Sequence, residues 1–228
     1  MYNVVDTFYA GLISTQAISA LTLSFMIFFL IIGFGYGFSS AITALLGNAL
    51  GKKRYKLASI YAHKGLIFVP LIGLTLSIIG YFFAPSLFMF LGAKDEYLQI
   101  SLDYINPILF GAIFFMFNFS LNSILIATGD TKTYRNSLIF GFFANLALNP
   151  LFMYGFLFVP AMGIKGIAFA TVLIQIINMF YLFYKVLQTK LIHFDKLEYF
   201  IPNLRIYKLF FTHGIPSSLN MLTMAIGS

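Results

Sequence analysis

Residues 17–56 read AISALTLSFMIFFLIIGFGYGFSSAITALLGNALGKKRYK, and this stretch determines the fold class. No residue between Thr7 and Gly51 carries a charge. A helix needs about 20 mostly apolar residues to cross the hydrocarbon core of a bilayer, so the stretch is long enough to span it. It ends in the densest basic cluster of the chain, and short basic loops stay on the cytoplasmic side. The stretch therefore predicts a transmembrane helix whose carboxyl end is cytoplasmic.

The composition of the whole chain agrees with a membrane protein. Of the 228 residues, 60% are hydrophobic and only 9% are charged, whereas soluble domains carry about 25% charged residues. The net charge of +7 would suggest nucleic acid in a soluble protein, but here the Lys and Arg residues lie in loops between apolar runs. The lipid bilayer is the expected partner, and nucleic acid is not. The absence of cysteine excludes disulfides, thiolate metal sites and cysteine nucleophiles.

Long uncharged runs predict an all-α integral membrane protein. The predicted spans are residues 17–51, 65–93, 104–129, 136–164, 166–184 and 209 to the end. Each must be helical because a bilayer offers no water to backbone N–H and C=O groups. Residues 1 to about 10 are interpreted as the last turns of a further helix whose start is absent. The first residues lack the basic region of a signal peptide.

Loop charges predict the orientation of these spans. The loops at 52–64, 130–135 and 185–208 contain twelve Lys and Arg residues, whereas the opposite side has only Lys94 and Lys165. This asymmetry places the three basic loops in the cytoplasm. The last of them, residues 185–208, is expected to lie partly as an amphipathic segment at the inner surface.

Glycines and prolines interrupt several spans. Gly33, Gly35 and Gly37 alternate in the first complete span, where glycine allows close helix packing or a hinge, and we favour packing. Pro107 and Pro150 each follow an asparagine inside a span. A proline frees a carbonyl one turn earlier, and interrupted helices are common at transporter sites, although prolines also occur in ordinary membrane helices. Both interpretations of the prolines stay open.

Asp6 is the acid that most resembles a functional group. It shares a helix face with Tyr2, four residues earlier, and Asn145 and Asn149 are also four residues apart. Gln175 and Asn178 share a face on the next span. A carboxylate facing amides from neighbouring helices would suit a protonation site or an oxygen-lined cation site, because intramembrane charges usually mark such paths. The alternative for the amides is hydrogen bonding that holds helices together.

The remaining ionisable residues favour simpler interpretations. Asp103 lies near the outer end of its span, and we interpret it as a solvated interfacial residue. His63, His193 and His213 lie near cytoplasmic helix ends, where solvated side chains are expected. They are too scattered for a metal cluster, and the sequence has no Ser–His–Asp or HExxH arrangement. We therefore expect no enzyme activity and no metal.

Six motifs follow one another along the chain. They are VDTF (5–8) with AG (10–11) and AISAL (17–21), GNALGK (47–52), ATGDTK (127–132), NLALNPLF (145–152), GIKGIAFAT (163–171) and GIPSS (214–218). In this order they resemble the multidrug and toxic compound extrusion (MATE) family. The resemblance implies the N-terminal six-helix lobe of a twelve-helix, two-lobe transporter, truncated at both ends. Residues 1–206 would form this lobe and residues 207–228 would begin helix seven, with the C-terminal lobe missing or supplied by another chain.

The resemblance also implies a function. The transporter would expel small cationic, amphiphilic compounds by alternating access, in exchange for H⁺ or Na⁺ and with no other cofactor. It would be a multi-pass protein of the plasma membrane, the inner membrane of a bacterium. Asp6 would be the coupling residue, with Tyr2, Asn145, Asn149 and Thr171 in the same pocket. The family often has Asp at the position of Asn149, so Asp6 is the only acid expected there.

Two alternatives remain. A flippase for lipid-linked oligosaccharides or polysaccharides has a similar two-lobe architecture, but it would be expected to carry Lys or Arg within its spans. The second alternative is a half-length subunit that does not transport and that pairs with a separate lobe. Because a lone lobe would expose cavity-facing polar groups to lipid, we expect the chain to be a fragment that is inactive by itself.

Overall fold

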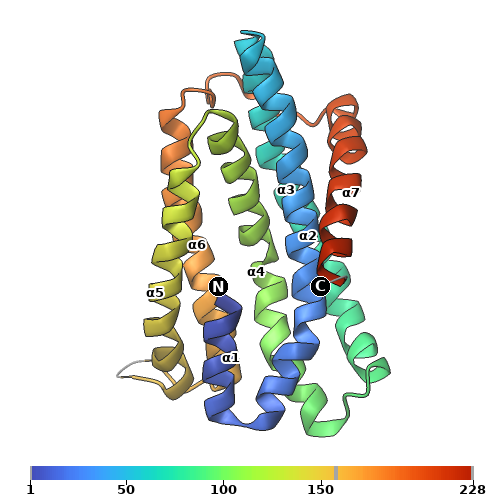
Figure 1. Cartoon of the computed structure of the whole chain (residues 1–228), viewed down its shortest axis with the longest axis vertical. Helices are drawn as coiled ribbons and strands as arrows, with labels where there is room; N and C mark the ends of the chain where they lie inside the picture. The colour runs from blue at the N-terminus through green and yellow to red at the C-terminus, as the bar shows by residue number, and fades with distance from the viewer. Residues whose placement is uncertain (1, 157–158, 227–228) are drawn as a thin grey trace. The chain divides into compact units, whose positions relative to one another are not determined.

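A computed structural model describes residues 2–156 and 159–226, and it confirms an all-α membrane fold. The α-helices within these residues are α1 (Tyr2–Ile13), α2 (Thr15–Gly51), α3 (Tyr55–Phe90), α4 (Asp95–Ala127), α5 (Lys132–Tyr154), α6 (Ile164–Gln188) and α7 (Leu204–Ile226), shown in Figure 1. In the described part of the chain, α2 to α6 are long and apolar enough to cross a membrane.

Some helix boundaries differ from the uncharged runs. Helices α3 and α4 begin about ten residues before the apolar runs at 65 and 104, because backbone hydrogen bonding continues into the charged turns at the membrane surface. Helix α5 was expected to reach residue 164 but ends at Tyr154. Gly155 follows with a φ of 77°, a left-handed conformation that breaks helical hydrogen bonding. A tight bridge between Phe156 and Val159 then turns the chain toward α6.

The chain forms two compact units. Unit 1 comprises residues 1–29, 75–112 and 138–177, and unit 2 comprises residues 30–74, 113–137 and 178–228. Within unit 1, α1 packs against α4, α5 and α6 (Figure 1), and side-chain hydrogen bonds join it to all three. This packing brings segments from distant parts of the sequence to one buried carboxylate.

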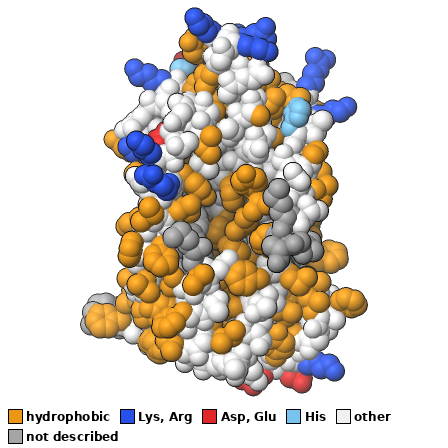
Figure 2. Space-filling view, viewed as in Figure 1, with side chains coloured by type: hydrophobic (Ala, Val, Ile, Leu, Met, Phe, Trp, Pro, Cys, Tyr) orange, Lys and Arg blue, Asp and Glu red, His pale blue; other side chains and the backbone are white. Residues whose placement is uncertain are grey.

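Large apolar side chains cover much of the outer surface, as the orange groups in Figure 2 show. In unit 1 the most exposed include Phe82, Phe90 and Phe110. A soluble protein rarely exposes so many large hydrophobic groups, whereas lipid solvates them. The surface is therefore that of a membrane protein.

Close contacts surround the three alternating glycines of α2 inside unit 2. A Cβ atom at Gly37 would collide with Ser218 of α7, and a Cβ atom at Gly33 would collide with Leu222, also of α7. On another face, a Cβ at Gly35 would collide with the ring of Phe119 on α4. Helices α4 and α7 thus approach α2 at positions where only hydrogen occupies the side-chain site.

The basic side chains of unit 2 gather near the loops that join its helices, toward the top of Figure 2. The twelve Lys and Arg residues of the three loops predicted to be cytoplasmic all belong to this unit. The connector between α6 and α7, residues 189–203, belongs to it as well. Among its described residues the one regular element is a short 3₁₀ helix, Leu197–Tyr199, so most of the connector is irregular.

The expectation of a solvated His63 is wrong. Because α3 begins at Tyr55, His63 lies two turns inside the helix, and its side chain is fully buried. The connector covers it: the His63 ring stacks on the His193 ring and meets Phe200 edge to face.

Candidate functional site

Asp6 is fully buried within unit 1. It lies on α1, and the side chains that contact it come from α4, α5 and α6. These helices lie beside α1 in Figure 1. No Lys or Arg among the described residues forms an ion pair with it. A buried carboxylate without a counter-charge carries a large desolvation penalty, so hydrogen bonds or a bound cation must stabilise its charge.

Three side-chain donors reach the Asp6 carboxylate. The Asn149 amide donates to Oδ1 over 3.0 Å, and the Tyr104 hydroxyl donates to Oδ2 over 3.0 Å. The Thr171 hydroxyl donates to Oδ2 over 3.2 Å. Each donor comes from a different helix, so the charge state of Asp6 affects the packing of α1 against its neighbours.

Asn145 extends this network. Its amide nitrogen donates to the Thr171 hydroxyl over 2.9 Å, and its oxygen accepts from Asn149 over 2.9 Å. Asn149 therefore uses its amide nitrogen for both Asp6 and Asn145. Its own Oδ1 is buried, and no hydrogen bond to it is found among the described residues. This free acceptor lies on a residue that already contacts Asp6, where a cation or a protonated group could use it.

Pro150 shapes the same region through its missing N–H. In an uninterrupted helix the N–H at position 150 would donate to the carbonyl of Leu146. Instead, the hydroxyl of Tyr9 on α1 donates to the Leu146 carbonyl over 2.9 Å. The proline thus provides a further link between α1 and α5 close to the Asp6 network.

The structure brings four of the five predicted pocket residues together: Asp6, Asn145, Asn149 and Thr171. The fifth, Tyr2, lies in α1, but its side chain is outside the described residues. Sequence analysis missed Tyr104. It directly follows Asp103, yet a rotation of about 100° per residue turns Tyr104 inward and Asp103 outward.

Asp103 stays at the surface of unit 1. Its side chain is 24% exposed and forms an ion pair with Lys165 over 3.1 Å. Gln99 also donates to it over 2.7 Å. This environment differs from that of Asp6, which is fully buried and forms no ion pair with any described residue.

A neutral cavity of about 380 Å³ lies within unit 2 between α2, α4 and α5. Its polar lining includes Ser39, Thr43 and Asn122. Ser39 and Thr43 donate to backbone carbonyls, so their remaining lone pairs are acceptors. The buried Oδ1 of Asn122 has no hydrogen-bond partner among the described residues. Two tyrosines, Tyr36 and Tyr134, also line the cavity, and its described lining residues include no charged side chain.

Comparison with known proteins agrees with these features. The MatE family model matches residues 1–151. A probable multidrug resistance protein of Bacillus subtilis, YoeA, is 31% identical over 218 residues, which cover 94% of this chain and 47% of that protein. An FAD transporter of Shewanella oneidensis is 28% identical over 170 residues, covering 75% of this chain and 38% of that protein.

Solved structures show the same fold. A structure described as "Crystal structure of MATE in the bent conformation" superposes with a TM-score of 0.89 and 27% identity, covering 99% of this chain and 50% of that one. The fold and the apolar surface define a multi-pass membrane protein, and its bacterial relatives indicate the plasma membrane. The chain belongs to the MATE family. It spans about half the length of the relatives that it matches.

Proposed function

We propose that this chain forms the cation-coupling lobe of a multidrug transporter, which expels cationic, amphiphilic compounds in exchange for H⁺ or Na⁺. The observation that carries the proposal is the environment of Asp6: fully buried, bonded to donors from three helices, and without an ion pair among the described residues. A carboxylate in this setting binds a cation when one is available, because neutralising it removes a large desolvation penalty.

Cation binding would change how α1 packs. When Asp6 is ionised, both of its oxygens accept hydrogen bonds from α4, α5 and α6. Protonation turns one oxygen into a donor and reduces its capacity to accept these bonds. The arrangement favours a proton, since a sodium ion needs several oxygen ligands and would require the Asn149 amide to turn its Oδ1 toward Asp6. Loading and release at Asp6 would thus bias two packings of α1, as alternating access requires.

The lining of the neutral cavity supports a cationic substrate. Aromatic rings and a few hydroxyl groups, with no Lys or Arg among the described lining residues, suit an organic cation better than an anion. Relatives named as multidrug resistance proteins support multidrug transport. The relative named an FAD transporter and the flippase alternative would both involve phosphate-bearing substrates. The spans predicted from the sequence contain no Lys or Arg that could bind such a phosphate group.

The complete transporter would need a second lobe. The relatives are about twice as long as this chain, so we propose a C-terminal lobe in the same or another chain as its partner. A half-length subunit without transport activity remains the second candidate.

Transport in proteoliposomes tests the proposal. The full-length protein, reconstituted with a fluorescent organic cation, should move the dye against its gradient when an inward H⁺ or Na⁺ gradient is imposed. Separate gradients identify the coupling ion. Dye movement that ignores both gradients would contradict coupling, and translocation of a lipid-linked sugar without dye transport would favour the flippase.

A further inference from the structure

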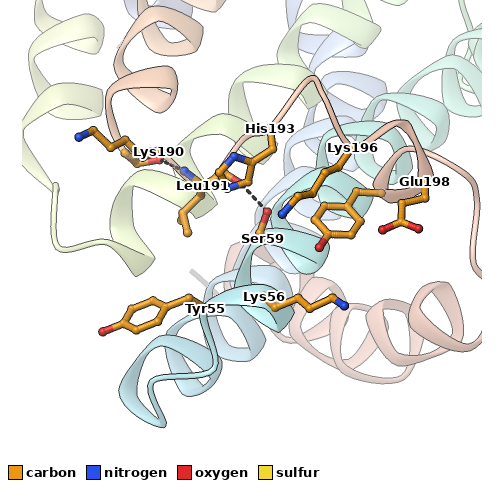
Figure 3. Close-up of a pocket in the computed structure, with 10 residues that line it drawn as sticks. Tyr55, Lys56, Ser59, Lys190, Leu191, His193, Lys196 and Glu198 are labelled. Carbon is orange, nitrogen blue, oxygen red and sulfur yellow. Dashed lines mark hydrogen bonds between the residues drawn. The ribbon is translucent and has the colours of Figure 1, made fainter.

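A separate cavity of about 610 Å³ lies in unit 2, between the start of α3 and the connector. Its lining includes Lys56 on α3 and Lys190, His193 and Lys196 on the connector, as Figure 3 shows. The loop charges place this end of α3 and α6 on the cytoplasmic side. The volume is within the range of small-molecule sites, about 300–1,000 Å³.

Buried hydrogen bonds hold the connector wall of this cavity against α3. The Ser59 hydroxyl donates to the carbonyl of Leu191 over 2.6 Å. One turn later, the Nε2 atom of His63 accepts the backbone N–H of His193 over 3.0 Å. This leaves Nδ1 of His63 to donate to the Ser59 carbonyl over 2.7 Å. The wall is therefore positioned by a buried serine and a buried histidine.

Lys64 adds a third attachment. Its ammonium group, largely buried, donates to the backbone carbonyls of Ile201 and Glu198. His63 and Lys64 are adjacent on α3 and lie one turn after Ser59. Together the three side chains attach the connector at points from Leu191 to Ile201. The cavity is thus a formed feature of the fold, and its charged side chains extend from a fixed backbone.

Positive charge dominates the cavity. In Figure 3, Lys196 reaches from the connector toward Ser59, Lys56 extends from the first turn of α3, and Lys190 points away from both. The Lys196 ammonium lies 5.5 Å from the ring centre of the buried Tyr199, which holds it near the cavity. Glu198 is the one acid among the described lining residues, and it forms no ion pair there with any of the lysines.

We propose that this basic pocket binds a phosphate group. Lysine ammonium groups bind phosphate as point charges, and Lys56 of α3 and Lys196 of the connector both line the pocket. Two sources share this chemistry: the headgroup of an anionic phospholipid and a soluble phosphate ester. A phospholipid headgroup is available because the cytoplasmic leaflet carries anionic lipids, which basic pockets on that side of membrane proteins bind. A bound phosphate would bridge α3 to the connector and so stabilise this attachment.

Native mass spectrometry of the detergent-purified full-length protein tests the proposal. The probes are phosphatidylglycerol, phosphatidylcholine and glycerol 3-phosphate. The test variant is Lys56→Gln/Lys196→Gln, and the matched control is Lys132→Gln/Lys208→Gln, which removes two exposed lysines outside the pocket. At about fivefold per lysine, the test variant should bind phosphatidylglycerol roughly 25-fold more weakly, while the control binds normally.

Each outcome separates the alternatives. Preferred binding of phosphatidylglycerol over phosphatidylcholine, lost in the test variant, supports a lipid headgroup. Binding of glycerol 3-phosphate with the same dependence, but no binding of the lipid, supports a soluble ester. Lys56→Arg/Lys196→Arg retains both charges and should restore binding, which excludes misfolding as the cause of the loss. Equal binding by the test and control variants would overturn the proposal.

Discussion

The side-chain amide of Asn149 donates a hydrogen bond to the carboxylate of Asp6 over 3.0 Å, although the two residues are 143 positions apart. Asn149 is fully buried, and its amide nitrogen also donates to Asn145. A residue that stabilises the charge of Asp6 is thus itself positioned by a neighbour on α5. The environment of Asp6 consequently depends on the pairing of α1 with α5, two helices that are far apart in the sequence.

Asn149→Leu should destabilise unit 1 and impair transport. The substitution removes one donor from a buried carboxylate and one partner from Asn145, a type of loss that is worth about 1–3 kcal/mol. Thermal unfolding of the detergent-purified protein measures the effect on stability. Asn136→Leu on the same helix is the control, because Asn136 is exposed and should tolerate the change. Equal unfolding temperatures for the two variants would refute a structural role for the Asn149 bond.

A double-mutant cycle tests the link between Tyr9 and Pro150. Tyr9→Phe should destabilise the protein by about 1 kcal/mol, because the carbonyl of Leu146 loses its donor. In a Pro150→Ala background the restored backbone N–H can donate to that carbonyl, so Tyr9→Phe should then have little effect. Additive changes in unfolding free energy would show that the two residues are independent.

Much of the fold was predictable from the sequence, because the backbone N–H and C=O groups of a membrane protein must form hydrogen bonds within each helix. Uncharged runs therefore located the spans, and the loop charges predict their direction. The end of α5 was not predictable from apolarity, because Phe156 and Val159 continue the hydrophobic run beyond the break at Gly155. His63 was misinterpreted because its burial results from the distant connector, which no local pattern around residue 63 reveals.

The candidate site was predictable only in part. Spacing placed Asn145 and Asn149 on one face and suggested that they face Asp6, and the family resemblance assigned them to the same pocket. Tyr104 was not predicted, because its side chain meets Asp6 only through the packing of α1 on α4. Tyr9 was missed for a similar reason, since its role depends on the carbonyl that Pro150 leaves free.

Gly37→Ala should destabilise unit 2, whereas Gly47→Ala should not. A Cβ at Gly37 would meet the backbone of α7 at Ser218 and Gly214, which cannot move aside as a flexible side chain would. A Cβ at Gly47 would meet no described atom within 4 Å, and alanine favours a helix over glycine by up to about 1 kcal/mol. Unfolding temperatures of the two variants should therefore shift in opposite directions. A neutral Gly37→Ala would show that α2 and α7 are not tightly packed there.

Asp130 should make the start of α5 sensitive to pH. The hydroxyl of Thr133 and its backbone N–H donate to the carboxylate and hold the pKa of Asp130 below its usual value. Since the folded pKa is the lower one, the stabilisation is present above the unfolded pKa and is lost as pH falls through the folded pKa. Asp130→Ala should reduce stability by about 1 kcal/mol at neutral pH and remove this dependence.

Asp130→Asn is the matched control, because asparagine caps a helix without titrating. It should retain most of the stability at neutral pH while losing the dependence on acidic pH. Unfolding followed at several pH values distinguishes the three proteins. Identical acid dependence in the parent protein and Asp130→Asn would show that another group is responsible.

The most direct test of the central claim is gradient-driven dye efflux by the full-length Asp6→Asn protein in membrane vesicles, compared with Asp103→Asn. Both variants remove one carboxylate, but only Asp6 is fully buried, whereas Asp103 is partly exposed and paired with Lys165. We predict that Asp6→Asn abolishes coupled efflux at a normal membrane level of the protein, while Asp103→Asn retains most of it. Efflux by Asp6→Asn at the parent rate would contradict the role of Asp6 as the coupling residue.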